Sequence, residues 1–288
     1  MTLPPIMAIP FPHQSPKPLS EHAADAATEQ ILAHLCRCCG TTLPALIFRQ
    51  LATREGLMGA FWKHLGGLFE SGQLQTVAWP LMEAIDTDGL ITSALPALEA
   101  PTLARARSTL EQYGRSNPVN LLALLTLLHQ VREGAGPAGP VTDRPEPWQA
   151  PPPPSAAMLP MVDVAAIDTG TRWLLNDLRS GDRRTLDAVV PSLYRHFVPY
   201  PALLQAVHRS LAPRFADGQI AARAQALQDR LQPAAAALAA RLGPVPEVLR
   251  QADVLATMQD FAQRVIPPMI IVGRALHRAL SDDRSARP

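Results

Sequence analysis

The first residues whose type and spacing could support chemistry are three cysteines in the segment Cys36-Arg-Cys-Cys39. Cys36 and Cys39 have the C-x-x-C spacing of thiol redox sites, and the neighbouring Arg37 would favour a thiolate. An odd number of cysteines in one cluster does not resemble the disulfide framework of a secreted protein. The sequence thus allows a Cys36/Cys39 thiol redox protein. The simpler interpretation is that the cysteines are incidental residues at a turn between two helices.

A second group of reactive side chains lies between positions 187 and 196. His196 could act as a general base near neutral pH, and Asp187 could do so if a loop shift brought it into a site. The alternatives are a structural histidine and an exposed acid before a helix. Arg195 could bind an anionic ligand, or it could bond to helix carbonyl groups and acids.

Other recognisable motifs are absent from the sequence. The eight histidines are scattered without the spacing of paired metal ligands. There is no phosphate-binding glycine loop, no dinucleotide fingerprint and no Gly-x-Ser-x-Gly nucleophile elbow. We therefore predict no metal site and no cofactor.

The composition indicates which elements must position these residues. Alanine and leucine are abundant, and alternating β-branched runs are nearly absent, so we predict an all-α fold. Many of the 30 prolines stand where a helix would begin, as in Asn117-Pro118, where Asn117 would cap the helix. Gly72, Gly114, Gly181 and Gly218 stand where helices would end. We expect helices at 21–35, 44–53, 56–70, 74–85, 99–112, 118–132, 169–179, 191–197, 201–215, 219–241, 246–264 and 267–280.

The net charge of the chain and the composition of its segments exclude several classes of partner. The chain has 288 residues, 47% of them hydrophobic, and a formal net charge of +1, which argues against a nucleic-acid partner. No apolar stretch is long enough for a membrane span, and residues 1–20 form a Pro-rich arm without the features of a signal peptide. We therefore expect no membrane partner and a cytoplasmic location.

A segment rich in proline and glycine, together with a sequence similarity between its two sides, indicates that the chain has two halves. Residues 134–157 are dense in proline and glycine, and they would be extended and semi-rigid between helical repeats at 21–133 and 158–288. The 28 positions from Pro44 to Gly72 align with the 27 from Pro191 to Gly218 across a single gap. These features predict two tandem helical repeats that form an intramolecular pseudo-dimer with a ligand pocket between them.

The alignment also pairs particular residues of the two halves. Arg49 pairs with Arg195, which favours a role in holding the fold, although either could bind an anionic ligand. Asn117-Pro118 pairs with Ile266-Pro267. A polar residue at a position that is apolar in the other half hints at function; the alternative is that Asn117 only caps its helix.

Several short motifs, in order, resemble the group I 2-haloacid dehalogenases, an all-helical pseudo-dimeric family similar to the alkylhydroperoxidase-D-like helical proteins. The resemblance covers roughly residues 28–282. The segments that support it are Leu51-Ala-Thr after Arg49, Tyr113-Gly114, Asn117-Pro118, Leu121-Leu-Ala-Leu-Leu-Thr, Leu159-Pro-Met-Val-Asp163 and Pro201–Gln205.

The resemblance implies hydrolysis of the carbon–halogen bond of 2-haloalkanoic acids, on both enantiomers and with inversion. In this family an aspartate activates a water that attacks C2 directly, without a covalent ester. A positioned base of this kind is typically worth about 10²–10⁴-fold in rate. The implied ligand is a small carboxylic acid.

Transfer of the family's site is incomplete, which marks a divergent member. Leu193 stands where the family has its aspartate, and a leucine cannot accept a proton. Residues that match the family's substrate-binding positions are Ala45, Asn117, Ser192 and Phe261. Residues that depart from it are Leu43, Leu46, Asn120 and Met258.

Three hypotheses follow. The first is a dehalogenase-like hydrolase whose base is not identified, with Asn117, Asp187 and His196 as weak catalytic candidates. The second is a non-catalytic protein of the same fold that binds a small carboxylate. The third is the Cys36/Cys39 redox protein. The sequence leaves open whether two copies form a homodimer.

Overall fold

The computed structural model describes residues 25–134, 148–179 and 189–282. Over these residues the chain is all-helical and has no strand, which confirms the predicted fold class. Asp187 and Gly181 lie outside the described residues, as do the predicted arm at 1–20 and much of the linker. No described helix is both long enough and apolar enough to cross a membrane.

The first half contributes five α-helices. They are α1 (Ala26–Cys39), α2 (Leu46–Leu51), α3 (Leu57–Glu70), α4 (Gln73–Glu83) and α5 (Ala100–Glu133). The Asp25 carboxylate caps α1 by accepting from the Thr28 N–H at 2.7 Å. The left-handed Gly40 at φ 63° ends the helix. The cysteines therefore occupy the last turn of α1, so the prediction that they lie at a turn between helices was wrong.

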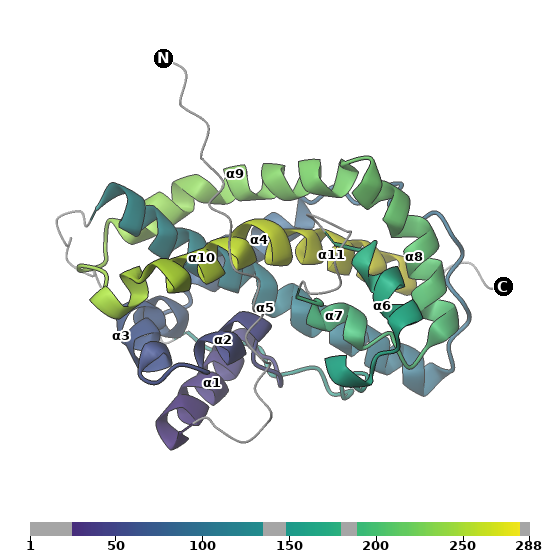
Figure 1. The fold of residues 1–288 in the computed structure, drawn as a ribbon, viewed down its shortest axis with the longest axis horizontal. Helices are drawn as coiled ribbons and strands as arrows, with labels where there is room; N and C mark the ends of the chain where they lie inside the picture. The colour runs from purple at the N-terminus through teal and green to yellow at the C-terminus, as the bar shows by residue number, and fades with distance from the viewer. Residues whose placement is uncertain (1–24, 135–147, 180–188, 283–288) are drawn as a thin grey trace, which may run out of the picture.

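The second half follows with six α-helices and three shorter helical segments. They are η1 (Val164–Ala166), α6 (Thr169–Asn176), α7 (Ser192–Arg195), α8 (Pro201–Ala216), α9 (Gln219–Ala239), η2 (Glu247–Arg250), α10 (Ala252–Asp260), η3 (Phe261–Val265) and α11 (Ile266–Asp282). Figure 1 shows α9, α10 and α11 running across the molecule, with α1–α3 grouped below one end and α6–α8 at the other. The long helices α5, α9 and α11 pack against one another. Their buried residues belong to one cluster with residues of both halves.

Helix α5 corrects three predictions. The expected helices at 99–112 and 118–132 are one continuous helix, so Gly114 lies inside it and Asn117 does not cap a helix start. Pro118 has no N–H and cannot bond to the Gly114 carbonyl, which costs one helix hydrogen bond. Burial of almost every residue from Ser116 to Leu127 outweighs that loss. As a result, the Asn117 side chain projects from the middle of a buried helix.

The helices α10 and α11 are also continuous with each other. The expected break between 264 and 267 is absent, because η3 is a π-helical segment that connects α10 to α11. The N–H of Ile266 bonds to the carbonyl of Phe261, five residues earlier. Segments of this kind add one residue to a turn and are frequent at functional sites. Phe261 and Val265 are the first and last residues of this segment.

The described end of the linker lies along the first half. Trp148 packs on Trp79 with ring centroids 5.6 Å apart, and any Cβ at Gly72 would overlap the Trp148 ring. Nη1 of Arg115 donates to the carbonyls of Gly40 and Pro152, at 3.0 and 2.7 Å. These contacts guide the chain to Met158 and Leu159, beside the cavity described next.

Candidate functional site

One cavity lies between side chains of the two halves of the chain, and we refer to it as the central cavity. The space open to the centre of a water molecule is about 40 Å³, compared with the roughly 10–15 Å³ that one water requires. It is thus larger than the space of a single water. The lining residues are Thr41, Leu43, Pro44, Ala45, Leu46, Ile47, Gln112, Tyr113, Ser116, Asn117, Met158, Pro191, Ser192, Leu193, Phe261, Val265, Ile266 and Met269.

The first half supplies most of the polar lining. Thr41, Gln112, Tyr113, Ser116 and Asn117 form a group that we call the polar wall. Tyr113 and Asn117 are four residues apart on α5 and therefore share one face of the helix. Asn117 is 8% exposed, and among the described residues nothing hydrogen-bonds to its side-chain amide. The amide lines the cavity and is not sealed off from it, so this group is available to a ligand.

Ser192 is the polar group that the second half brings to the cavity. It is the first residue of α7, follows the rigid Pro191, and is buried. Nη2 of Arg49, on α2, donates to the Ser192 hydroxyl at 3.3 Å. Burial raises the pKa of Tyr113 to about 12, so its phenol stays protonated near neutral pH and can donate. The Tyr113 hydroxyl is buried and makes no well-formed hydrogen bond to a described residue, but the Ser192 hydroxyl is near enough to oppose the effect of burial on its pKa.

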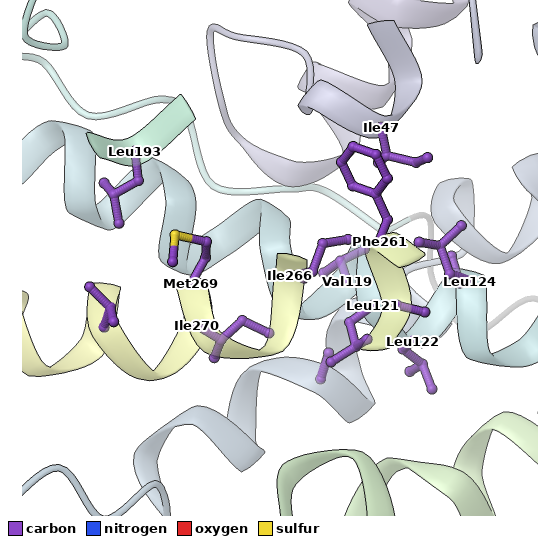
Figure 2. Packing of buried hydrophobic residues seen from close by; sticks show 14 of the residues in the cluster. Ile47, Val119, Leu121, Leu122, Leu124, Leu193, Phe261, Ile266, Met269 and Ile270 are labelled. Atoms are coloured by element: carbon purple, nitrogen blue, oxygen red, sulfur yellow. The ribbon is translucent and has the colours of Figure 1, made fainter. Parts of the chain in front are cut away.

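The remaining second-half lining is hydrophobic. Leu193, Phe261, Val265, Ile266 and Met269 form what we call the apolar wall. Figure 2 shows the Phe261 ring directed toward Ile47, with Leu193 and Met269 further along the same region. Leu193 is 0% exposed. A leucine therefore occupies the wall at the position where the resemblance expects a catalytic aspartate.

His196 lies near the cavity but does not line it. Its Nδ1 lies 2.6 Å from the Leu159 carbonyl, so Nδ1 carries a proton and Nε2 is the free acceptor. Burial lowers the pKa of His196, which keeps the ring neutral near pH 7. Nε2 has no partner among the described residues, and the ring contacts the edge of Tyr113 at a centroid distance of 5.7 Å. His196 thus packs against Tyr113, a residue that lines the cavity.

The structure brings together Ala45, Asn117, Ser192 and Phe261, the four residues chosen from the sequence as ligand-binding. His196 stands one side chain away. The sequence analysis did not assign Tyr113, Ser116 or Arg49 to the site. The four-residue spacing of Tyr113 from Asn117 was a usable signal, whereas the contact of Arg49 with Ser192 joins residues 143 positions apart and leaves no local pattern.

The cysteines are poorly placed for redox chemistry. All three are free and buried. Burial raises the pKa of Cys36, raises the pKa of Cys38 to about 11, and raises the pKa of Cys39 further. Buried thiols of this kind are inert because the thiolate is the nucleophile. Within the part of the chain that the structure describes, no three His, Cys, Asp or Glu side chains are grouped to hold a metal ion.

Comparison with known proteins identifies the fold. No protein-family model matches the chain, and no curated protein matches its sequence. Among solved structures, a complex of a D-2-haloacid dehalogenase mutant with D-2-CPA is 16% identical, has a TM-score of 0.60, and aligns over 93% of this chain and 94% of its own. A complex of D-2-haloacid dehalogenase with L-LA is also 16% identical, with a TM-score of 0.61 and coverage of 97% and 98%. The chain therefore has a haloacid dehalogenase-like fold.

Proposed function

We propose that this chain binds a small carboxylic acid in the central cavity and does not hydrolyse it by the aspartate mechanism of the dehalogenases. The observation that carries the proposal is the composition of the lining. Among the described residues, it contains no carboxylate and no histidine, but several neutral hydrogen-bonding groups. Leu193 supplies hydrophobic contact where a base would be needed.

The two walls suit the two ends of such a ligand. The amide of Asn117 and the hydroxyls of Tyr113 and Ser192 can donate to a carboxylate. Leu193, Phe261 and Met269 can cover a short alkyl chain or a halogen. Pockets of this composition, mostly apolar with a few placed polar groups, are typical of small-molecule sites.

One observation favours hydrolysis as a second candidate. Nε2 of His196 is a buried acceptor without a described partner, and the ring is neutral near pH 7. In that mechanism a water would attack C2 of a 2-haloacid, halide would leave, and His196 would take the proton of the water. His196 does not line the cavity, so this route needs a water that bridges Nε2 and the ligand.

Two assays on the same purified protein distinguish the candidates. Calorimetric titration with propionate tests binding, and halide release from racemic 2-chloropropionate and 2-bromopropionate at pH 7 to 10 tests hydrolysis. The proposal predicts binding without halide release. Halide release that is lost in His196→Gln would establish the second candidate instead. Absence of propionate binding by a folded protein would refute the proposed function.

A further inference from the structure

Arg49 and Arg195 place two cations beside the central cavity, of which Arg195 is buried and Arg49 is half-buried. The Nε atom of Arg49 is buried and has no hydrogen-bond partner among the described residues. No ion pair joins either guanidinium to an acid of the described chain, and each is close enough to the Tyr113 side chain to interact with it electrostatically. The Arg195 cation, together with burial, lowers the pKa of Arg49. A buried cation without a counter-charge is expensive, and an anionic ligand would offset that cost.

The two arginines have different surroundings. Arg195 is 7% exposed, and its Nε donates to the carbonyl of Val162 at 2.8 Å. Its charge also interacts favourably with Asp163. Arg49 has no equivalent backbone or acidic partner, and its one hydrogen bond is to Ser192. Arg195 therefore holds the segment 162–163 in place. The charge of Arg49 has no acidic partner among the described residues and can interact with an anion in the cavity.

The contact with Ser192 determines what the cavity can recognise. The Ser192 oxygen accepts from Arg49, so its own O–H can donate, either to a ligand or to the neighbouring Tyr113 phenol, whose pKa a hydrogen bond from Ser192 lowers. Ser192 and Tyr113 both line the cavity. An O–H polarised by a guanidinium is a stronger donor to an anion than an isolated hydroxyl.

We propose that Arg49 is a positioning residue that, through Ser192, makes the central cavity select the anion of a short aliphatic acid over an uncharged ligand of the same shape. This inference rests on the proposed function, and it adds the source of charge selectivity. The ligand's carboxylate would accept from the Ser192 hydroxyl. Its negative charge would offset the unpaired guanidinium behind that hydroxyl.

The test compares propionate with propionamide, which has nearly the same shape but no charge. Calorimetry on the full chain gives both dissociation constants for wild type, Arg49→Met and Arg49→Lys. Loss of a charge-assisted contact should weaken propionate binding in Arg49→Met by about tenfold or more. Propionamide binding should stay nearly unchanged, and Arg49→Lys should recover part of the preference.

A matched control is Arg172→Met. Arg172 is likewise a half-buried arginine, but it donates to the backbone carbonyls of Ile167 and Val164 and has no contact with Ser192. This variant should lower stability and leave the preference for propionate intact. If Arg49 had only a structural role, Arg49→Met would also lower stability and leave the preference for propionate unchanged. That result would overturn the inference, but it would leave the proposed function standing.

A second variant and a second anion cover the remaining outcomes. If Arg49→Met does not fold, Ser192→Ala removes the relay and should lose the same preference; a retained preference would overturn the inference. If wild type binds neither ligand, the proposed function fails. The inference is then tested by measuring thermal stability during a titration with nitrate. An increase in the stability of wild type but not of Ser192→Ala would support the inference. No increase in either protein would overturn it.

Discussion

The two walls of the central cavity differ in chemistry and in how they are built. The polar wall comes from the first half, chiefly from the middle of α5, where Asn117 has an amide without a described partner. The apolar wall comes from α7, the π-helical segment η3 and the first turns of α11, and its side chains pack into the continuous core. Apart from Ser192, the polar groups available to a ligand are thus on the polar wall, whereas the apolar wall belongs to the core that stabilises the fold.

Leu193 shows how the apolar wall is built. It is fully buried and belongs to the core. A leucine there carries none of the desolvation cost that a buried carboxylate would carry. The apolar wall is therefore expected to be optimised for packing, and the polar wall for recognition. Each of the following variants tests one side of that comparison.

Leu193→Ala should have the largest effect, on stability. Removal of a fully buried leucine from a packed wall typically costs about 2–5 kcal/mol of unfolding free energy. Urea denaturation followed by circular dichroism would measure the loss. Leu32→Ala, at a partly exposed position of α1, is the control and should cost clearly less. Equal costs for the two variants would mean that Leu193 is not part of a tightly packed wall.

Asn117→Ala should have the next largest effect, on binding. Loss of a hydrogen bond to a charged ligand corresponds to about a tenfold or larger increase in the dissociation constant for propionate. Stability should not fall, since the amide has no described partner and alanine is the better helix former.

The control for Asn117 is Asn120→Ala. Asn120 stands on the same helix and is buried, but it does not line the cavity. Calorimetry should show unchanged propionate binding for this variant. Equal losses of affinity in the two variants would indicate a general effect on α5 and would break the assignment of the polar wall.

His196 should make the unfolding free energy of the protein fall at acidic pH. Its pKa is lowered in the folded protein by burial, so the unfolded chain binds a proton more readily. Its contribution to stability is complete above the unfolded pKa of about 6.5 and falls as the pH drops below it. His196→Gln should therefore flatten the decline of the unfolding free energy between pH 7.5 and 5. His129→Gln, near the end of α5, should keep the wild-type slope; identical slopes for all three proteins would exclude His196 as the cause.

The cysteines should have the smallest effect. Cys36→Ser with Cys39→Ser removes both members of the C-x-x-C spacing, and neither residue lines the cavity. Propionate binding should be unchanged, and neither wild type nor the variant should show thiol-dependent reductase or peroxidase activity. Thiol-dependent turnover by wild type that the variant loses would revive the redox hypothesis.

The sequence predicted the fold class and named four residues that line the central cavity, but it did not predict the continuity of the long helices. Alanine and leucine content and apolar periodicity are local properties, so the helices and the buried runs could be found from them. Asn117-Pro118 matched the pattern of a helix start. Local sequence preferences do not include the burial of the residues on both sides of Pro118, and that burial keeps α5 continuous at the proline. The tandem repeat and its pairing of Asn117 with Ile266 stay predictions.

The site was partly predictable for the same reason. Ala45, Asn117, Ser192 and Phe261 were found through a resemblance that matched single positions, and they do share the cavity. The contact of Arg49 with Ser192 and the contact of His196 with Leu159 depend on the tertiary arrangement of distant segments. Neither contact has a sequence spacing that could reveal it.

The most direct test of the two-wall account is a crystal structure of the protein with 2-bromopropionate, in which anomalous scattering locates the bromine. The account predicts an intact ligand, with its carboxylate at Asn117 and Ser192 and its bromine against Leu193, Phe261 and Met269. A 2-hydroxy acid in place of the ligand would contradict the proposed lack of hydrolysis. A bromine on the polar wall, or a ligand bound outside the cavity, would contradict the division between the two walls.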